Sequence, residues 1–141
     1  MTAGVTVRRG GPDDIPGHAA VRGIGPGELA SYTAWVTAHT ATHLPFVADL
    51  DGRVVGVAWL YVAARVPGPG APVRRFGDVQ AVDVHADHRN RGIGGALIAA
   101  LLAEARALGL LFVTVHSGRR AVDFYLRAGF THHRQLLLWE P

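Results

Sequence analysis

The sequence predicts an α/β domain in which one mixed sheet carries helices on both faces. Residues 79–84 alternate apolar and polar as a strand does, and after a glycine-rich turn residues 96–108 continue as an unbroken helical pattern. Asp51 and Gly52 separate two apolar runs, which indicates a hairpin. Further along, strand and helix patterns alternate, as in units where a helix connects two parallel strands.

Size and composition limit the class of protein. The 141 residues fit one domain, which we expect to span residues 1–141. With 49% hydrophobic and 18% charged residues, the chain has the composition of a globular protein. All 14 basic residues are arginine, which excludes a lysine Schiff base and a Walker-type phosphate loop. The chain has no cysteine, which excludes disulfides, a thiolate nucleophile and cysteine-ligated zinc.

Charge and hydropathy argue against nucleic-acid and membrane partners. The formal net charge is +3, and the arginines lie singly or in pairs among acidic residues, without interleaved aromatic residues. The N-terminus lacks the apolar core of a signal peptide. Residues 93–115 are apolar, but charged residues and a glycine interrupt them, so we interpret them as buried core rather than a membrane span. We therefore expect a cytoplasmic protein.

The first 45 residues predict one strand and two helices. Residues 5–9 alternate as a short strand, and the glycine and proline residues at 10–12 end it. An aspartate can cap a first helix over residues 13–22. A second helix is expected from Glu28 to about Thr42.

The rest of the chain predicts five strands and two helices. Residues 67–72 predict a loop, because their three prolines cannot donate to a strand ladder. The expected order is β-α-α-β-β-β-α-β-α-β, with the later strands at 46–49, 54–62, 76–84, 111–115 and 135–139 and the later helices at 96–108 and 119–127. The apolar last strand could also pair with a second subunit, which would form a homodimer.

The glycine-rich turn predicts a phosphate-binding site. A turn that leads into a helix leaves backbone N–H groups unpaired, and the helix dipole and nearby arginines attract an anion to them. The dinucleotide-binding fingerprint does not fit, because Leu97 stands where its third glycine or alanine would be. The turn has the sequence Arg89-Asn90-Arg91-Gly92-Ile93-Gly94-Gly95.

Two motifs resemble those of the GNAT superfamily of N-acetyltransferases. The pattern Arg89-x-x-Gly92-x-Gly94 resembles the acyl-CoA-binding signature of that family, and residues 84–97 are similar to its strand–turn–helix junction. A second block resembles the late helix in which Phe-Tyr is followed by Gly-Phe. The block reads Asp123-Phe124-Tyr125-Leu126-Arg127-Ala128-Gly129-Phe130. The resemblance covers essentially the whole chain and implies the GNAT acyl-CoA N-acyltransferase fold, with acetyl-CoA as co-substrate.

The resemblance also implies how acetyl-CoA would be bound. Backbone amides of the turn would bind the pyrophosphate, and the strand before it would hold the pantetheine arm through backbone groups. Many relatives carry asparagine at the position of Gly118, so that contact is either missing here or made by Ser117. The expected cofactor-binding residues are Val82, Asp83, Val84, Arg89, Asn90, Arg91, Gly92, Ile93, Gly94, Gly95, Ser117 and Tyr125.

Two side chains are catalytic candidates. In the family, a tyrosine at the position of Tyr125 lies near the CoA sulfur and can return a proton to the leaving thiolate. The alternative is a tyrosine that only packs on an amphipathic helix. Asp78 falls where some relatives place the residue that deprotonates the amine, and the alternative is a solvated aspartate in a turn.

The strand before the turn also sets which side chains share a face. A period of two places Asp78, Gln80, Val82 and Val84 together, unless a bulge intervenes. Asp83 would then point to the other face, where a structural role is more consistent with its position.

The amine-binding residues and a metal site are harder to predict. We expect Tyr32, Trp35, Gln80 and His116 to contact the substrate, although helix periodicity equally predicts the two aromatic residues to be core. His39 and the histidine four residues later share a predicted helix face, but no glutamate or third ligand accompanies them, so we expect no metal.

Together these features predict an acetyl-CoA-dependent N-acetyltransferase. A primary amine, on a small molecule or a peptide, would attack the thioester directly in a ternary complex, which needs no covalent nucleophile and agrees with the absence of cysteine. One alternative is a non-catalytic GNAT-fold module that binds acyl-CoA. Another is a nucleotide hydrolase that uses the glycine turn for its phosphates. The sequence does not identify the acceptor.

Overall fold

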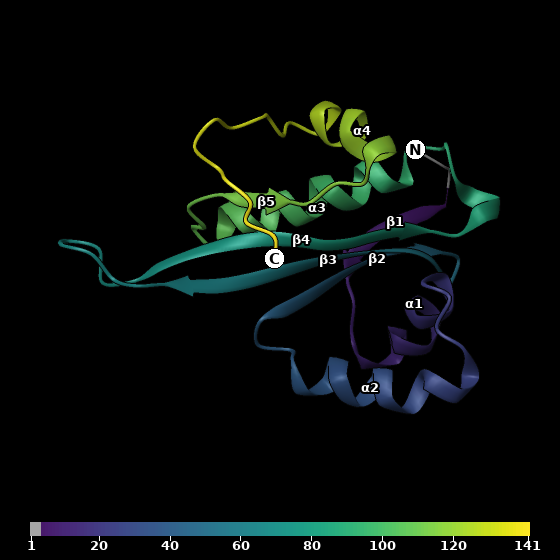
Figure 1. Cartoon of the computed structure of the whole chain (residues 1–141). Coiled ribbons are helices and arrows are strands. Elements are labelled where there is room, and N and C mark those ends of the chain that lie inside the picture. Colours follow the sequence, from purple (N-terminus) through teal and green to yellow (C-terminus); the bar gives the residue numbers. More distant parts are fainter. Residues whose placement is uncertain (1–3) are drawn as a thin grey trace.

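The computed structural model describes residues 4–141 and contains one five-stranded sheet between two helical layers (Figure 1). The strands lie side by side in chain order. Neighbours from β1 to β4 are antiparallel, and β5 is parallel to β4. The predicted mixed α/β class is therefore confirmed.

The strands are β1 (Val5–Arg9), β2 (His43–Leu50), β3 (Arg53–Arg65), β4 (Arg74–Val84) and β5 (Val113–Val115). The helices are α1 (Ile15–Val21), α2 (Leu29–Ala38), α3 (Ile93–Ala107) and α4 (Val122–Arg127). Short 3-10 turns precede α1, α2 and α4, and another lies between β4 and α3. Compared with the prediction, α2 ends earlier and β2 begins earlier, at His43. Within residues 4–141 no helix combines the length and the apolar character needed to cross a membrane.

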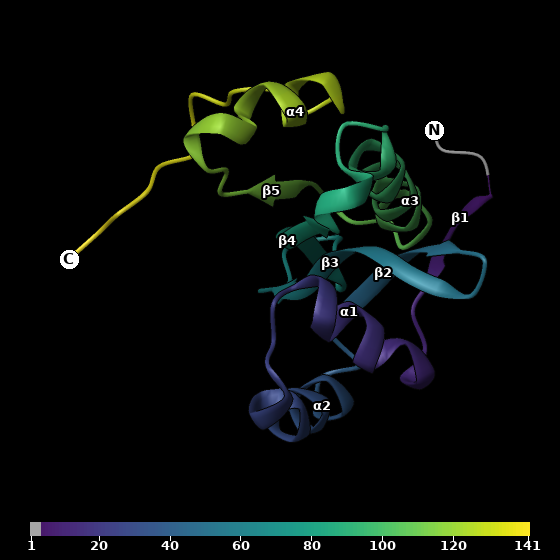
Figure 2. The same cartoon turned by 90° about the vertical axis from the view of Figure 1, so that its right-hand side faces the viewer.

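Helices lie on both faces of the sheet (Figure 2), and the two helical layers bury different cores. On one face, α3 packs its buried residues Ile93, Leu97 and Leu101, spaced four apart, against the sheet. On the other face, α1 and α2 cover a smaller cluster around Val57 and Trp59 of β3. β3 is thus covered on both sides, which explains why its sequence is almost entirely apolar.

A bulge at Gln80 changes the side-chain alternation of β4. Trp59 of β3 lies opposite Ala81 and the next residue lies opposite Val79, so Gln80 is one extra residue. Val82 and Val84 consequently pack toward α3, whereas Ala81 packs toward α1 and α2. The prediction that Asp78 and Gln80 share a face with the two valines is therefore wrong, and the bulge is the reason.

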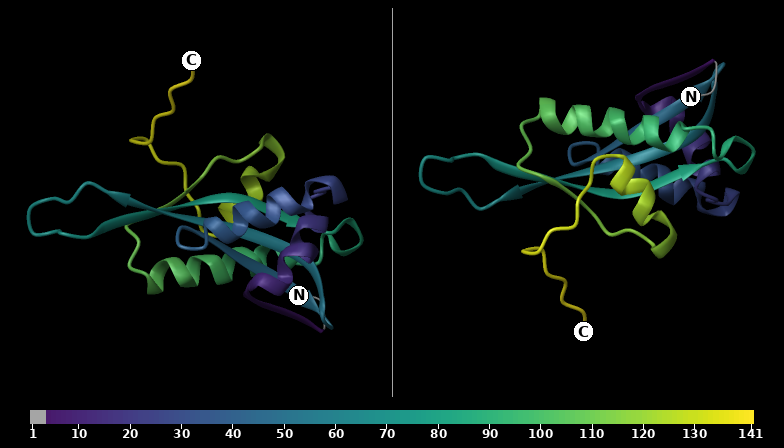
Figure 3. Two further views of the ribbon diagram at one scale, coloured as in Figure 1. Left: turned by 90° about the horizontal axis from the view of Figure 1, so that it is seen from below. Right: turned by 90° about the horizontal axis from the view of Figure 1, so that it is seen from above.

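β3 and β4 extend beyond the other strands as a two-stranded arm (Figure 3). The proline-rich residues 67–72 form the tip, where Gly68 and Ala71 bridge the two sides, so the predicted loop is confirmed. On the edge of β4 that faces away from β3, β5 pairs only with Gly77–Val79. Residues 80–84 therefore have a sheet neighbour on the β3 side alone among the described residues.

The predicted strand at residues 135–139 does not form. Leu136 to Trp139 are between 60% and 87% exposed, and the segment leaves the body of the domain (Figure 2). A strand needs a partner with a free edge, and three-residue β5 offers only a short one. The apolar composition of this segment was therefore not sufficient to make it a strand.

Candidate functional site

The backbone of the glycine turn leads into α3 through left-handed residues. Asn90 has φ 60° and Gly92 has φ 79°. The amide of Ala96 donates to the carbonyl of Gly92 at 3.0 Å and closes the first turn of the helix. The amides of Ile93, Gly94 and Gly95 precede this bond and have no helical acceptor. They form a cluster of free N–H donors at the positive end of a 15-residue helix.

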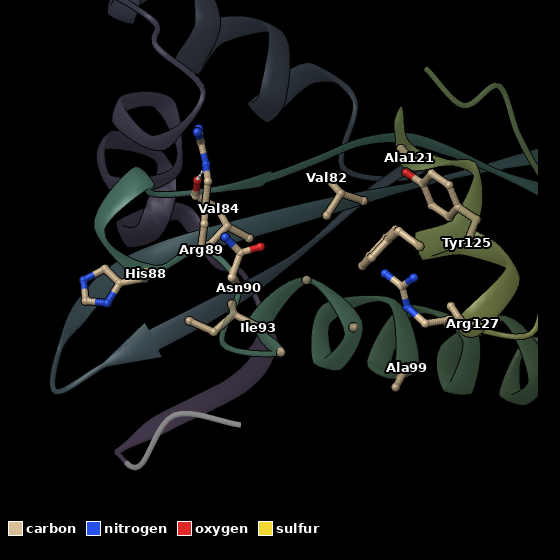
Figure 4. A pocket seen from close by; sticks show the side chains of 15 residues that line it. Val82, Val84, His88, Arg89, Asn90, Ile93, Ala99, Ala121, Tyr125 and Arg127 are labelled. Atoms are coloured by element: carbon tan, nitrogen blue, oxygen red, sulfur yellow. Dashed lines mark hydrogen bonds between the residues drawn. The ribbon is translucent and has the colours of Figure 1, made fainter. Parts of the chain in front are cut away.

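A cavity of about 720 Å³ lies beside this turn, between β4, α3 and α4 (Figure 4). β4 contributes Val82 and Val84 to its lining, and the turn contributes Asn90 and the three glycines. From the other side, α4 contributes Phe124, Tyr125 and Arg127. The phosphate-type turn and the predicted catalytic tyrosine thus share one cavity.

A side chain would have a different effect at each of the three glycines of the turn. Gly92 has a left-handed conformation, which L side chains rarely adopt. A Cβ on Gly94 would lie 3.2 Å from the Phe124 ring, so a larger residue would displace that ring. A Cβ on Gly95 would meet no protein atom within 4 Å and would point into open space, where Gly95 lines the cavity. Of the three, Gly95 is therefore the one that the fold itself does not require, and its missing side chain keeps space free in the cavity.

The two arginines of the turn have different positions. Arg89 donates through Nε to the carbonyl of Val84 at 3.0 Å, which ties the turn to the end of β4, and it also lines the cavity. Arg91 is exposed and lies outside the lining.

Tyr125 reaches the cavity from α4. Its ring packs edge-on against Phe124 and Phe130, with centroid distances of 4.9 and 5.5 Å. Burial raises the pKa of the Tyr125 hydroxyl, and the negative charge of Asp83 raises it further. The hydroxyl is therefore protonated at neutral pH and available as a proton donor.

Other predicted site residues lie outside this cavity. Ser117 donates to the carbonyl of Gly118 at 2.7 Å, and His116 is exposed after β5. Asp83 forms an ion pair with Arg22 on the α1 and α2 side of the sheet. Asp78 accepts a hydrogen bond from Thr114 Oγ1 at 2.6 Å and another from the side chain of Gln80.

A second cavity, of about 320 Å³, lies on the α1 and α2 side of β4. Three of the four predicted substrate-binding residues line it together, namely Tyr32, Trp35 and Gln80. The rest of its lining is Arg22, Ile24, His43 and Trp59, which we did not predict from the sequence. Arg22 and Ile24 follow α1, His43 begins β2 and Trp59 lies in β3, so no local motif could have identified them as a group.

A buried histidine lies next to the second cavity and contacts one of its lining residues. His18 is completely buried, and its Nδ1 lies 2.9 Å from the Tyr32 hydroxyl oxygen. Burial lowers the pKa of the His18 imidazole to about 4, so the ring is neutral at physiological pH. Sequence reasoning missed this residue, since a single histidine on a helix carries no signal.

One carboxylate lies near both cavities. Asp83 is 3.4 Å from Nε of Arg22, which lines the second cavity, and its charge acts on Tyr125, which lines the first. Gln80 and Val82 likewise line different cavities although only one residue separates them on β4. The two cavities therefore adjoin across a single strand.

Two further observations concern groups without a predicted role. Arg127 lines the first cavity, and Figure 4 shows its guanidinium in the space between α4 and α3. Arg127 belongs to the late-helix block, which was the only sequence signal for it. As for metals, residues 4–141 bring no three histidine, aspartate or glutamate side chains together in a way that could hold an ion.

Comparisons with known proteins give a consistent result. The acetyltransferase (GNAT) family matches residues 18–130. A mycothiol acetyltransferase from Thermobispora bispora is 36% identical over 89 residues, which are 61% of this chain and 29% of that protein. A glucosamine 6-phosphate N-acetyltransferase from Trypanosoma brucei brucei is 34% identical over 88 residues, 62% of this chain and 58% of that protein. The matches thus span less than two thirds of either relative.

Solved structures share the fold over almost the whole chain. A Trypanosoma brucei acetyltransferase superposes with a TM-score of 0.77 at 25% identity, covering 97% of this chain and 99% of that one. A predicted acetyltransferase with acetyl-CoA from Clostridium acetobutylicum superposes with a TM-score of 0.76 at 16% identity, covering 96% of each chain.

Proposed function

The chain belongs to the acetyltransferase (GNAT) family, and from this premise we propose that it transfers an acetyl group from acetyl-CoA to a primary amine. The amine would attack the thioester directly, with both substrates bound at once. The observation that carries the proposal is the first cavity, which combines free helix amides, the end of β4 and a protonated tyrosine.

Each part of that cavity suits one part of acetyl-CoA. The free amides at the start of α3, with the helix dipole behind them, would bind the pyrophosphate. The backbone of Val82 and Val84 would hold the pantetheine amides as an added strand, since β5 leaves that edge of β4 unpaired. These contacts would position the thioester, which is a large part of catalysis in a reaction without a covalent intermediate.

Tyr125 is the proposed general acid. As the amine nitrogen bonds to the acetyl carbon, the carbon–sulfur bond breaks and the thiolate needs a proton, which the Tyr125 hydroxyl would donate. Its raised pKa keeps the proton on the hydroxyl oxygen until the carbon–sulfur bond breaks and the thiolate accepts it.

The second cavity is the proposed acceptor site. It adjoins the first across β4, and it contains Tyr32, Trp35 and Gln80. The relatives named for mycothiol and glucosamine 6-phosphate support a small-molecule acceptor. Asp78 is the proposed base, acting directly or through a water molecule. It would remove a proton from the ammonium group, because only the neutral amine has the lone pair that attacks the thioester.

Calorimetry with acetyl-CoA and a thiol-release assay on a panel of amines test the proposal together. We expect Tyr125→Phe to lower kcat by roughly 10²–10⁴-fold while the Kd for acetyl-CoA stays within about twofold, because only proton transfer is lost. Tyr61→Phe is the matched control, since Tyr61 itself lines neither cavity and a phenylalanine keeps the ring that stacks on His43. Equal losses in binding and turnover would contradict the acid role. Binding without turnover of any amine would instead favour a non-catalytic acyl-CoA module.

A further inference from the structure

The second cavity combines aromatic walls with hydrogen-bond donors. Tyr32, Trp35, His43 and Trp59 supply rings, and Arg22 supplies a guanidinium. Three potential donors meet here, namely Arg22, the Tyr32 hydroxyl and the Trp59 indole N–H. A group of converging donors in a partly apolar site is suited to an anionic oxygen ligand.

The indole N–H of Trp59 is the clearest indication of a ligand. Trp59 is only 2% exposed, and its Nε1 has no hydrogen-bond partner within the described chain. The Tyr32 hydroxyl lies close to it, but the indole N–H does not meet that oxygen in hydrogen-bond geometry. An indole nitrogen can only donate, and a buried donor without an acceptor costs roughly 1–3 kcal/mol. An acceptor atom in the cavity would remove that cost.

The Arg22 guanidinium has N–H donors that its ion pair with Asp83 does not use. Arg22 forms an ion pair through Nε with Asp83 at 3.4 Å, and its side chain also lies close to the Tyr32 hydroxyl. Within residues 4–141 neither of its terminal nitrogens forms an ion pair with a carboxylate. Its side chain is 35% exposed, so a ligand can reach it. The planar guanidinium suits two-pronged binding of a carboxylate or phosphate, and Asp83 fixes its orientation.

The position of the proton on the His18 ring determines which way the Tyr32 hydroxyl points. His18 Nε2 is buried and has no partner. If the proton were there, a second buried donor would be unpaired, whereas a proton on Nδ1 leaves only a lone pair without a partner. Nδ1–H then donates to the Tyr32 oxygen, and the Tyr32 O–H is free to donate into the cavity.

We propose that this cavity recognises an acceptor amine that also carries an anionic group, a carboxylate or a phosphate, bound by Arg22, Trp59 Nε1 and the Tyr32 hydroxyl. The inference rests on the proposed acetyltransferase function. Asp83, beside the guanidinium, gives the ammonium end of the same molecule an anionic neighbour. At about 320 Å³ the cavity has the volume of about ten waters, which fits a compact amine rather than a folded protein tail.

Matched amine pairs test this specificity. One pair is an amino acid and its methyl ester, and the other is phosphoethanolamine and ethanolamine, each assayed by thiol release at saturating acetyl-CoA. We expect kcat/KM to be at least about tenfold higher for the anionic member of one pair, and that pair identifies the anion. Arg22→Gln should remove the difference, because kcat/KM for the anionic member should fall to that of the neutral member in the same variant. Arg53→Gln, at an exposed arginine outside both linings, should keep it.

A binding measurement separates this inference from the function it rests on. In ¹H–¹⁵N spectra of the CoA-bound protein, the Trp59 indole signal, assigned with Trp59→Phe, should shift on addition of the preferred anionic amine. It should not shift with the neutral partner, nor in Arg22→Gln. No anion preference in turnover and no anion-dependent shift would overturn the inference. If acetyl-CoA binds but no amine is turned over, the function fails, and the indole shift alone then decides whether the anion site exists.

Discussion

The cavities on the two faces of β4 are built from different materials. The first is largely made of backbone, since three consecutive residues, 93–95, supply the free amides and two strand residues supply an open edge. The second is made of side chains from the end of α1, from α2 and from three strands. A backbone site depends on conformation and so tolerates few changes, whereas a side-chain site can change its ligand without changing the fold. This difference is typical of a protein with a fixed cofactor and a variable acceptor.

The largest expected effect concerns the acid stability of the α1 and α2 side. Within residues 4–141 His18 is the one buried polar or charged residue, and it lies under the second cavity, while the core beneath α3 is apolar. Because burial lowers its pKa from 6.5 to about 4, the unfolded chain binds a proton in this window and the folded chain does not. Stability should therefore fall as pH drops from about 6.5 to about 4, by roughly 3 kcal/mol in total.

Urea unfolding at a series of pH values checks this expectation. His18→Gln removes the titrating group, so its free energy of unfolding should lose less on acidification than that of the wild type, by about 3 kcal/mol. His132→Gln, at an exposed histidine, should keep the wild-type dependence. Parallel curves for wild type and His18→Gln would show that the buried imidazole is not what makes this side acid-sensitive.

The next effect tests whether the first cavity depends on backbone alone. Gly95→Ala adds one methyl group that meets no protein atom within 4 Å, so the helix should gain up to about 1 kcal/mol. The same methyl would separate the helix amides from a phosphate, and we expect the Kd for acetyl-CoA to rise by about tenfold. Calorimetry and thermal melts measure the two changes, and Gly11→Ala, equally open but outside the lining, is the control. Unchanged affinity would mean that the amides are not the phosphate contact.

The smallest expected effect falls on the proposed base. Asp78→Asn should lower activity by several-fold, mainly at low pH, where the amine most needs help to lose its proton. The side chain is otherwise held by Thr114 and Gln80, which an asparagine can still contact. A pH–rate profile against Asp13→Asn, an exposed aspartate, measures the difference. A profile identical to that of the wild type would remove Asp78 as the base.

The same contrast explains what could be predicted from the sequence. The glycine turn, the Asp51-Gly52 hairpin and the proline-rich tip are local features, because adjacent residues alone determine their backbone. The bulge at Gln80 depends on how β4 pairs with β3, and the missing strand at 135–139 depends on whether a free edge is within reach. Neither condition can be read from the residues of the segment alone, because both depend on distant parts of the chain.

The candidate site divides in the same way. Gly92, Gly94 and Gly95 were recognisable as a group because their spacing is short and fixed. Arg22 and Trp59 lie 37 positions apart in the chain and come together only when α1 packs on β3. Each looks ordinary in its own segment, as a helix-end cation and a core aromatic residue.

The extra residue at Gln80 acts as a change of phase in β4. Before it, odd-numbered residues such as Val79 face α3, and after it even-numbered residues do, so Val82 and Val84 line the first cavity while Asp83 faces Arg22 on the opposite side. Deleting this one position would place Val79 directly before Ala81 in a regular ladder with β3, so both valines and Asp83 would keep the faces they have now. The strand would lose only the bulge and the glutamine that lines the second cavity, so we expect such a deletion to alter the second cavity more than the first.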